Sequence, residues 1–464
     1  MLFSSVTFLY YFLPLTVLLY YVAPDKWKNY VLLFVSLVFY SLGELKFLYV
    51  LVTSCVINYS ISILFDKNVR YRKHLFVIGV AINVLALLYF KYTNFFISNI
   101  NNIFDVNVKY LNIVMPLGIS FFTFQSISYL IDIYTKKSKI PKNIFYYSTY
   151  ICLFPQLIAG PIVRYEDISQ ELNNRKHSFS KFSEGVKRFS FGLTKKILIA
   201  NVLGGLVLML NYLSDKTVVS YIIGNISYML QIYFDFSGYS DMAIGLGLMF
   251  GFRFLENFNY PFIAKSITDF WRRWHISLSM FLRDYVYIPM GGSRNSMLKW
   301  FRNIFVVWFL TGFWHGASWN FIIWGIYFAL ALVIEKFLLK SFLDNHRIIA
   351  HIYTLFIVLI SFIIFNNESL NEVLISVKSM LGFGGLDFIN SETIYYLRSY
   401  VVLIVVAIVA STPAVSNLAK LIGKSKKYKN LIDVAEVILY VVILLVCTAF
   451  LINSSFNPFL YFRF

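Results

Sequence analysis

The sequence has 464 residues, of which 59% are hydrophobic and 14% are charged. Soluble domains carry about 25% charged residues, so this composition excludes an ordinary soluble domain and predicts an all-α polytopic membrane protein. The formal net charge is +18, but the lysines and arginines lie in short loops between apolar runs. This pattern indicates cytoplasmic loops that meet anionic membrane lipid, and it argues against a nucleic-acid partner.

Four apolar runs begin the chain, and the charges between them predict a topology. The runs are Val6–Val22, Tyr30–Ser41, Phe47–Phe65 and Leu75–Phe90. The loop Asp66–His74 is strongly basic, so the positive-inside rule places it in the cytoplasm. Counting crossings back from this loop places the N-terminus outside, and counting forward places the loop Ser98–Tyr110 outside.

The segment Ile144–Gly160 breaks this alternation. The run Met115–Ile133 leads to a lysine-rich loop before the segment, and Gly160–Lys196 after it is also basic. We therefore predict that Ile144–Gly160 enters and leaves the membrane on the same side. Its stretch Phe154–Pro161 holds two prolines and a glycine, which prevent a continuous helix. Broken backbone at membrane depth requires cover from protein or a water-filled cavity, so the pattern predicts a cavity.

The next polar signal follows the apolar run Tyr221–Phe234. Asp235, Ser237 and Asp241 come directly after this run, and such residues do not face lipid. We interpret them as candidate substrate-binding or donor-binding residues. The following run, Met242–Phe252, is short, so we predict that it crosses the membrane only in part.

The stretch Phe270–Ser279 contains the first of two candidate catalytic residues, His275. Ser266 and Asp269 resemble a capping box that opens a helix, and Pro289 follows where that helix should end. An apolar stripe at helical spacing supports one continuous helix between them. The stripe comprises Phe270, Trp274, Leu278, Phe281 and Tyr285.

The second candidate catalytic residue, His315, follows the apolar run Asn303–Phe313. This run is too short to cross the core of a bilayer, so it should bring His315 to mid-depth. Gly312 and Gly316 allow a second backbone to approach closely. The remaining predicted runs bring the total to about eleven crossings or partial crossings. They are Ile197–Leu213, Phe321–Val333, a span that ends near Phe365, Tyr400–Ala410 and Leu431–Ile452.

The two histidines allow several interpretations from the residues alone. Histidine is the usual general base for an alcohol nucleophile, but each ring could also be a hydrogen-bonded core residue or part of a proton relay in a transporter. We predict no metal site, because no two histidines are three or four residues apart and no His-Glu-x-x-His run exists. Arg272 and Arg273 fit two roles equally, as interfacial anchors or as ligands of a phosphate-rich donor.

Several long motifs resemble the membrane-bound O-acyltransferases, in particular the bacterial branch that includes the membrane subunit of alginate O-acetylase. The runs that carry the resemblance are Pro116–Gln125, Phe154–Tyr165, Gln231–Gly245, Phe270–Gly292, Trp314–Gly325 and Asn457–Phe464. The resemblance implies a ring of about eleven helices around a central funnel or tunnel. It also implies that an acyl group passes from a cytoplasmic thioester to a hydroxyl group, with His315 as the principal catalytic residue and His275 as the second.

From this resemblance we expect acetyl-CoA as the donor substrate, no bound cofactor and a polysaccharide as the acceptor. The acceptor would be an alginate-like exopolysaccharide or a cell-wall glycan. We also expect an extracytoplasmic partner of the serine-esterase type. The enzyme should reside in the bacterial cytoplasmic membrane with both termini outside. Transfer of D-alanine from a carrier protein to teichoic acid is the alternative within the same chemistry, and a histidine-relay transporter is the alternative from another class.

We predict one integral-membrane domain, residues 1–464, divided into N-terminal helices (1–112), a catalytic core (113–340) and C-terminal helices with an outward tail (341–464). The motifs that carry the resemblance run from Pro116 to the end of the sequence, and before Pro116 only the general hydrophobic pattern matches. Candidate binding residues for substrate or donor are Arg272, Arg273, Trp274, Trp314, Asp235, Ser237, Asp241 and Asp269, and Tyr461 is a candidate acyl relay. Two departures from the branch stand out: Asp269 replaces the more frequent Glu, and Phe365–Ser369 replaces a common Phe-Phe-Arg-Ala and so lacks its arginine.

Overall fold

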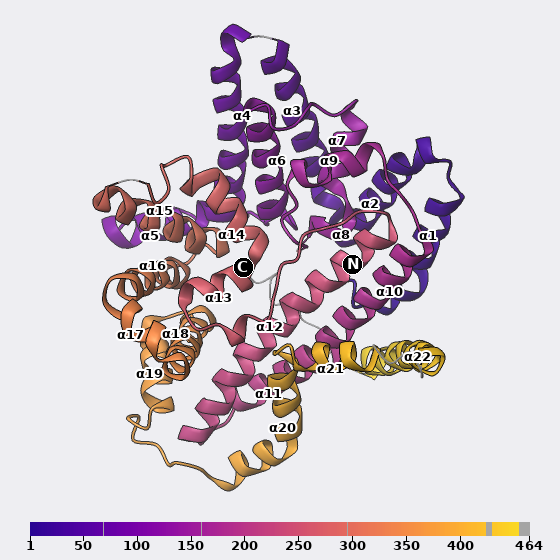
Figure 1. Cartoon of the computed structure of the whole chain (residues 1–464). Coiled ribbons are helices and arrows are strands. Elements are labelled where there is room, and N and C mark those ends of the chain that lie inside the picture. The colour runs from indigo at the N-terminus through magenta and orange to yellow at the C-terminus, as the bar shows by residue number, and fades with distance from the viewer. Residues whose placement is uncertain (68, 159, 295, 424–428, 454–464) are drawn as a thin grey trace. The chain divides into compact units, whose positions relative to one another are not determined.

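The computed structural model describes the chain except residues 68, 159, 295, 424–428 and 454–464 (Figure 1). All regular secondary structure in the described residues is helical, as predicted. Backbone contacts divide the chain into two compact units, and we describe each by itself. Unit 1 comprises Met1–Phe189, Ser240–Glu256 and Met280–Pro289, and unit 2 comprises Ser190–Tyr239, Asn257–Ser279 and Met290–Phe464.

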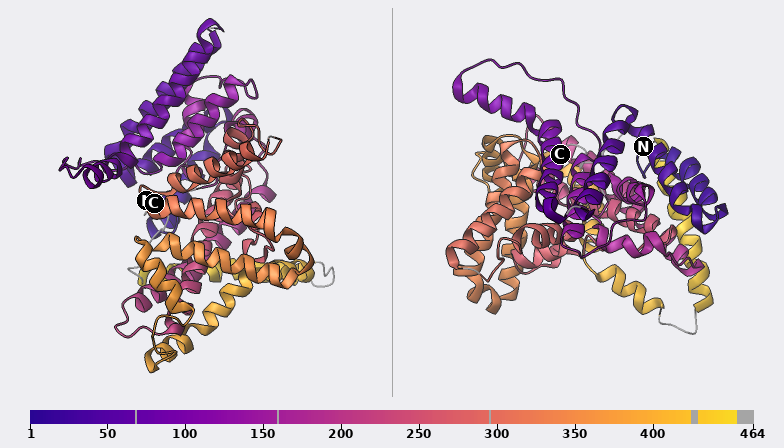
Figure 2. Two further views of the ribbon diagram at one scale, coloured as in Figure 1. Left: turned by 90° about the vertical axis from the view of Figure 1, so that its left-hand side faces the viewer. Right: turned by 90° about the horizontal axis from the view of Figure 1, so that it is seen from above.

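The first ten α-helices belong wholly or mainly to unit 1. They are α1 (Leu13–Val22), α2 (Lys28–Glu44), α3 (Leu48–Lys67), α4 (Arg72–Leu87), α5 (Thr93–Phe104), α6 (Ile119–Tyr134), α7 (Ile144–Cys152), α8 (Phe154–Leu157), α9 (Tyr165–Asn173) and α10 (Phe179–Thr194). Helices α3 and α4 form a hairpin against which α6 packs (Figures 1 and 2). The amides of Asn58 and Asn83 join the hairpin through reciprocal hydrogen bonds of 3.1 and 2.6 Å. Such polar pairs hold apolar helices together where hydrophobic burial alone would not.

The later helices lie wholly or partly in unit 2. They are α11 (Val202–Asn211), α12 (Val218–Met249), α13 (Ile267–Arg273), α14 (Ile276–Leu282), α15 (Met297–His315), α16 (Trp319–Ile334), α17 (Lys340–Asn345), α18 (Arg347–Asn366), α19 (Leu370–Met380), α20 (Ser391–Ala410), α21 (Ala414–Gly423) and α22 (Lys429–Asn453). Short 3-10 and π-helical segments lie between the α-helices. They are Phe8–Phe12, Asp25–Trp27, Leu45–Phe47, Val69–Tyr71, Leu88–Tyr92, Lys195–Asn201, Pro261–Ile263, Arg283–Tyr287 and Glu335–Leu339.

Seven helices among the described residues are long and apolar enough to cross a membrane. They are Asp25–Lys67, Arg72–Phe104, Phe179–Asn211, Trp319–Asn345, Arg347–Asn366, Ser391–Ala410 and Asn430–Asn453. The span in α20 is only 11% buried and that in α22 only 6%, so their apolar side chains are free to face lipid. These spans confirm the prediction of a multi-pass membrane protein.

Helix α12 contains the polar residues that follow Phe234 and most of the run Met242–Phe252. That this run crosses the membrane only in part stays a prediction. The helix runs unbroken through 32 residues. The carboxylates inside it are neutralised by cations from the preceding helical segments. In unit 2, Lys196 Nζ lies 2.5 Å from Asp235 Oδ1, and in unit 1 an arginine pairs with Asp241. Pairing offsets the cost of burying these charges inside the helix.

The predicted discontinuity in Ile144–Gly160 is confirmed. Helix α7 ends at Cys152, and only the four-residue α8 follows before the chain leaves helical geometry. At this break the backbone N–H of Phe154 donates to the side chain of Ser36, at 3.1 Å from Oγ. The side of the membrane on which this segment begins and ends stays a prediction.

The predicted loop Ser98–Tyr110 is wrong in its first half, because α5 continues to Phe104. Asn99 stabilises this extension by donating to the carbonyl of Phe95, at 2.7 Å. Asp105 then adopts a left-handed conformation with φ of 47°, which ends the helix. The asparagines between Ser98 and Phe104 therefore lie in a helix and not in the predicted loop.

Candidate active site

Helix α13 begins where the sequence predicted. The side chain of Ser266 caps the helix by accepting a hydrogen bond of 2.9 Å from the backbone N–H of Asp269. The helix nevertheless ends at Arg273, so the single continuous helix predicted up to Pro289 is wrong. Trp274 adopts an extended conformation, and His275 has a left-handed φ of 45°. This break turns the chain at the histidine, and α14 then begins at Ile276.

Asn257 holds the broken backbone together. Its carbonyl oxygen accepts from the N–H of Ile276 at 3.0 Å, and its side-chain Oδ1 accepts from the N–H and the hydroxyl of Ser277 at 3.2 and 2.8 Å. Asn257 is completely buried. Sequence reasoning missed this residue, because its hydrogen-bond partners lie 18 to 20 positions later in the chain.

The same asparagine defines the proton position on His275. Oδ1 of Asn257 also lies 3.2 Å from His275 Nδ1. Because a backbone N–H donates to this oxygen, it is an acceptor, and Nδ1 must carry the proton. Burial lowers the pKa of His275 to about 3, so the imidazole is neutral at physiological pH. In the neutral ring Nε2 is then the basic nitrogen.

His315 is the last residue of α15, at the turn of a tight hairpin between α15 and α16. A Cβ atom at Gly312 would overlap the carbonyl oxygen of Phe321, and one at Gly325 would overlap the carbonyl oxygen of Trp308. The two helices can therefore approach this closely only because both positions are glycine. The prediction that Gly312 permits close backbone approach is confirmed.

A single indole connects the two histidines. The ring centroid of Trp314 lies 6.0 Å from that of His275 and 5.0 Å from that of His315. On the far sides, Phe236 packs edge-on against His275 at 4.7 Å, and Trp324 packs edge-on against His315 at 5.0 Å. The two sequence motifs therefore meet in unit 2.

We call this assembly the histidine cluster. Its six rings are those of Phe236, His275, Trp314, His315, Trp324 and Phe365. His275 is 1% exposed and His315 is 7% exposed. Two imidazoles thus share a buried aromatic environment. Electrostatic interactions with a developing charge are stronger there than in water.

The predicted binding residues divide into those near the cluster and those apart from it. Trp314 belongs to the cluster, and Trp274 packs beside the break against Phe362 at 5.2 Å. Asp235 and Ser237 flank Phe236 on α12 and are buried, with Asp235 in the ion pair with Lys196. Asp235 therefore holds α12 in place next to the cluster.

The remaining candidates lie elsewhere. Arg273 forms an ion pair of 2.9 Å with Asp269 one turn before it, and Arg272 is exposed to solvent. Asp241 belongs to unit 1, where it pairs with Arg188 at 2.6 Å. Tyr461 lies outside the described residues. Within the described residues, no group of three or more side chains has a composition that could hold a metal ion.

The family model of the membrane-bound O-acyltransferases matches residues 4–371. This chain belongs to the membrane-bound O-acyltransferase family. It is therefore an O-acyltransferase, and the resemblance drawn from its motifs is confirmed. The match includes both histidines and the whole histidine cluster.

Similar proteins modify different acceptors. A protein of Azotobacter vinelandii named "Probable alginate O-acetylase" is 37% identical over the full length of both chains. The peptidoglycan O-acetyltransferase of Helicobacter pylori is 36% identical over 83% of this chain and 81% of its own. The teichoic acid D-alanyltransferase of Bacillus subtilis is 29% identical over 55% of this chain and 70% of its own.

Proposed function

We propose that this enzyme transfers an acetyl group from cytoplasmic acetyl-CoA toward hydroxyl groups of an extracytoplasmic polysaccharide. The observation that carries the proposal is the pair His275 and His315, joined by Trp314 inside a buried aromatic cluster. The similarity to O-acetylating relatives over most of the chain supports acetyl as the transferred group.

His315 is the proposed general base. It takes the proton from the incoming hydroxyl group as the oxygen attacks the carbonyl carbon of the thioester. The tetrahedral intermediate then collapses, the carbon–sulfur bond breaks, and the proton held by the imidazole passes to the leaving thiolate. The products are an O-acetyl ester and free CoA thiol, and His315 returns to its starting protonation state.

His275 is the proposed orienting residue. Its Nδ1 proton points to Asn257, so Nε2 is the nitrogen that carries the basic lone pair and acts as a hydrogen-bond acceptor. A neutral ring with this tautomer suits orientation of a hydroxyl group better than donation to a developing oxyanion. We therefore propose that His275 orients the incoming hydroxyl group.

The aromatic walls supply the environment for this chemistry. The rings of Trp324 and Phe365 pack edge-on against His315 at 5.0 and 5.3 Å, and the cluster is buried. Exclusion of water protects the thioester from hydrolysis and strengthens each polar interaction. Neither ring was singled out from the sequence, because aromatic residues are abundant throughout the chain.

The setting of the reaction completes the proposal. We propose that the helices form a ring around a funnel, that the enzyme resides in the bacterial cytoplasmic membrane with both termini outside, and that a serine-esterase-like partner completes transfer to the polysaccharide. The relatives named for alginate and peptidoglycan modification support an extracytoplasmic glycan acceptor. Family membership favours this enzyme over a histidine-relay transporter.

The test is replacement of His315 by alanine and by glutamine in the purified, membrane-reconstituted enzyme. Loss of a general base costs about 10²- to 10⁴-fold in rate, so both variants should transfer acetyl from labelled acetyl-CoA at that reduced rate. His74→Gln is the matched control, because His74 is exposed and lies in unit 1. Normal acetyl transfer by a folded His315→Ala enzyme would rule out this role.

A second candidate function is D-alanyl transfer from a carrier protein, which the similarity to a teichoic acid D-alanyltransferase favours. The donor that the enzyme consumes distinguishes these two candidate functions. Turnover of acetyl-CoA without a carrier protein supports acetyl transfer, whereas turnover of only a D-alanyl carrier protein supports the alternative.

A further inference from the structure

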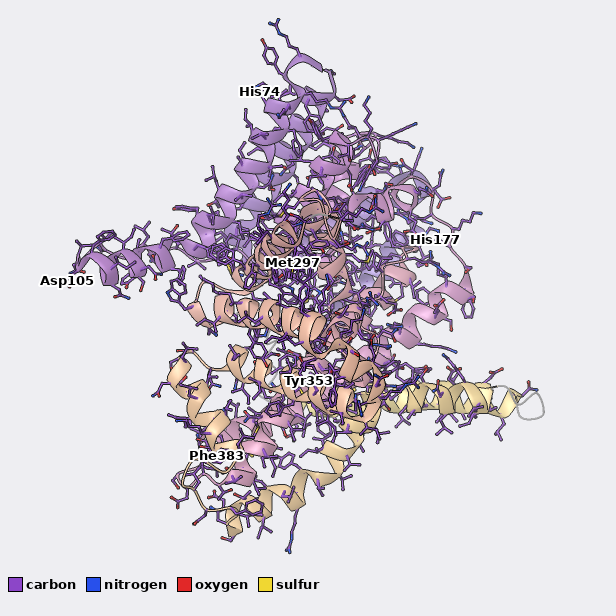
Figure 3. All side chains as sticks on the ribbon, turned by 60° about the vertical axis from the view of Figure 1, so that its left-hand side comes forward. His74, Asp105, His177, Met297, Tyr353 and Phe383 are labelled. Carbon is purple, nitrogen blue, oxygen red and sulfur yellow. The ribbon has the colours of Figure 1, made fainter. Side chains whose placement is uncertain are left out.

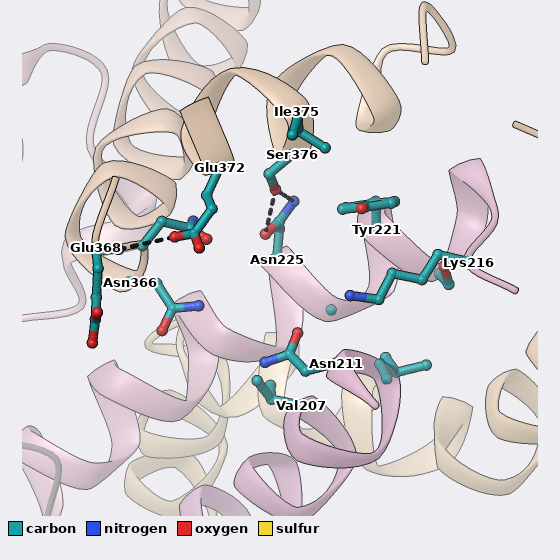
Figure 4. A pocket seen from close by; sticks show the side chains of 14 residues that line it. Val207, Asn211, Lys216, Tyr221, Asn225, Asn366, Glu368, Glu372, Ile375 and Ser376 are labelled. Atoms are coloured by element: carbon teal, nitrogen blue, oxygen red, sulfur yellow. Dashed lines mark hydrogen bonds between the residues drawn. The ribbon is translucent and has the colours of Figure 1, made fainter. Parts of the chain in front are cut away.

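A polar cavity of about 430 Å³ lies in unit 2, outside the histidine cluster (Figure 4). This volume is within the range of about 300–1,000 Å³ that small-ligand sites occupy. Asn211, the last residue of α11, and Asn366, the last residue of α18, both line it. Two candidate membrane spans, Phe179–Asn211 and Arg347–Asn366, end at these residues. The cavity therefore lies where spans end, at a membrane boundary.

Helix α18 connects the cavity to the catalytic histidine. The ring of Phe365 packs edge-on against His315 at 5.3 Å, and the next residue, Asn366, lines the cavity. The end of α18 thus contributes one residue to the histidine cluster and the next residue to the cavity. A molecule held in the cavity would lie next to the wall of the proposed active site.

The cavity offers hydrogen-bonding groups that the fold leaves available. The side chains of Asn211, Asn366 and Glu368 are exposed and make no hydrogen bond within the described part of the chain. Asn225 is held in place by a hydrogen bond of 3.2 Å to Ser376 Oγ. Lys216 and Asn366 extend into the hollow from opposite sides, with Asn211 and Asn225 between them (Figure 4). Amides both donate and accept, which matches the hydroxyl groups of a sugar.

The aromatic and charged groups restrict the ligand further. The half-buried ring of Tyr221 lines the cavity with the ammonium group of Lys216 at 5.8 Å from its centroid, and an aromatic face suits the apolar face of a sugar ring. Glu368 and Glu372 carry two negative charges against the single positive charge of Lys216. A polyuronate would be repelled by this balance.

We propose that this cavity binds an uncharged sugar unit of the acceptor glycan, beside the helix end that also carries Phe365. The proposal rests on the proposed function, because it assigns the acceptor class of the same reaction. It also makes a neutral, amide-bearing or hydroxyl-bearing glycan the preferred acceptor over a polyanionic one such as alginate. Asn366, Asn367 and Glu368 line the cavity and belong to the segment Phe365–Ser369, which lacks the arginine common in the resembling branch.

The experiment measures binding of two oligosaccharide probes to the full-length enzyme in lipid nanodiscs. The probes are the tetramer of N-acetylglucosamine, which is uncharged, and a tetramer of mannuronic acid, which is anionic. Wild type is compared with Asn366→Ala, Asn211→Ala and Glu368→Lys. Asn107→Ala is the control, because Asn107 is exposed, lies in unit 1 and does not line the cavity.

The neutral tetramer should bind wild type more tightly than the anionic one. Each asparagine variant should lose about three- to tenfold in affinity, the effect of one hydrogen bond, while its melting temperature without ligand stays at the wild-type value. Glu368→Lys should shift the preference toward the anionic tetramer, and Asn107→Ala should bind as wild type does.

Three results would overturn the proposal. In the first, wild type and both asparagine variants bind the neutral tetramer with equal affinity. In the second, wild type binds the anionic tetramer more tightly than the neutral one. In the third, the tetramer binds only when the extracytoplasmic partner protein is present. Consumption of acetyl-CoA, measured in the same preparation, tests the proposed function separately. An enzyme that binds the tetramer but never consumes acetyl-CoA refutes the function and leaves the cavity assignment standing.

Discussion

At the scale of single residues, the protein positions His275 by breaking a helix and repairing the break. A left-handed φ of 45° is costly for most side chains, and Asn257 compensates by accepting hydrogen bonds from the backbone N–H groups of Ile276 and Ser277, directly after the turn. The same contact orients the imidazole and selects its tautomer. One buried asparagine therefore controls the backbone, the ring and the proton.

The burial of His275 predicts how stability depends on pH. In the folded protein burial lowers the pKa of His275 to about 3, whereas an unfolded histidine titrates near 6.5. The unfolded chain therefore takes up a proton that the folded protein refuses, and the free energy of unfolding falls as the pH drops below about 6.5. Relative to a variant that cannot titrate, wild type should lose about 2 kcal/mol between pH 7 and pH 5.

The variant for this measurement is His275→Asn, because asparagine tolerates a left-handed φ and keeps the turn. Thermal unfolding in detergent at pH 7 and pH 5 gives the difference. The control His74→Asn replaces an exposed histidine and should follow wild type. Identical pH dependence in wild type and His275→Asn would contradict the buried, neutral state of His275.

At the scale of helices, close packing at glycine positions shapes the site. The α15–α16 hairpin needs Gly312 and Gly325, because an added Cβ at either would meet backbone of the opposite helix. Backbone cannot move aside as a flexible side chain can, so the hairpin would have to open. Met297 marks the start of α15, and Tyr353 lies on α18, which packs on α16 (Figure 3).

Gly325→Ala should therefore destabilise the protein by about 1–3 kcal/mol and reduce acetyl transfer, since it moves the helix end that carries His315. The matched control is Gly205→Ala in α11, where an added Cβ meets no atom within 4 Å. Alanine there is neutral or stabilising by about 0.4–1 kcal/mol. Melting temperature and transfer rate are measured together, and equal behaviour of the two variants would disprove the packing argument.

A buried ion pair between Lys196 and Asp235 joins α12 to the helical segment before it. Both side chains are 3% exposed, and removal of one partner would leave an uncompensated buried charge. Asp235→Asn should therefore destabilise the protein by about 3–5 kcal/mol. The double variant Lys196→Met with Asp235→Asn should recover much of that loss. Losses that simply add in the double variant, as measured by thermal unfolding, would argue against direct coupling.

At the scale of the whole molecule, the charge pattern still carries the predicted orientation, and labelling can test it. The native cysteines Cys55, Cys152 and Cys447 are all buried, so background reaction should be low. Lys67 and Asn107 are exposed positions on loops predicted to lie on opposite sides. In intact cells, a membrane-impermeant thiol reagent should label Asn107→Cys and leave Lys67→Cys unlabelled until the membrane is opened. The reverse pattern would invert the topology.

The sequence by itself determined the features that depend on local chemistry. Apolar runs predicted a helical membrane protein, Ser266 predicted the start of α13, and two prolines and a glycine predicted the break after α7. The motifs around His275 and His315 indicated the family and the candidate catalytic residues, because both histidines stand out in an apolar chain.

Only the tertiary structure decided the features that depend on partners distant in the sequence. Lys196 lies 39 positions before Asp235 and pairs with this carboxylate inside α12, and Asn257 lies 18 positions before His275 and stabilises a break where helical periodicity predicted none. Local propensity cannot foresee either outcome, because a charge or a broken backbone is costly only until its partner is known. The meeting of His275 and His315 around Trp314 is a result of the same kind, produced by packing between separate segments.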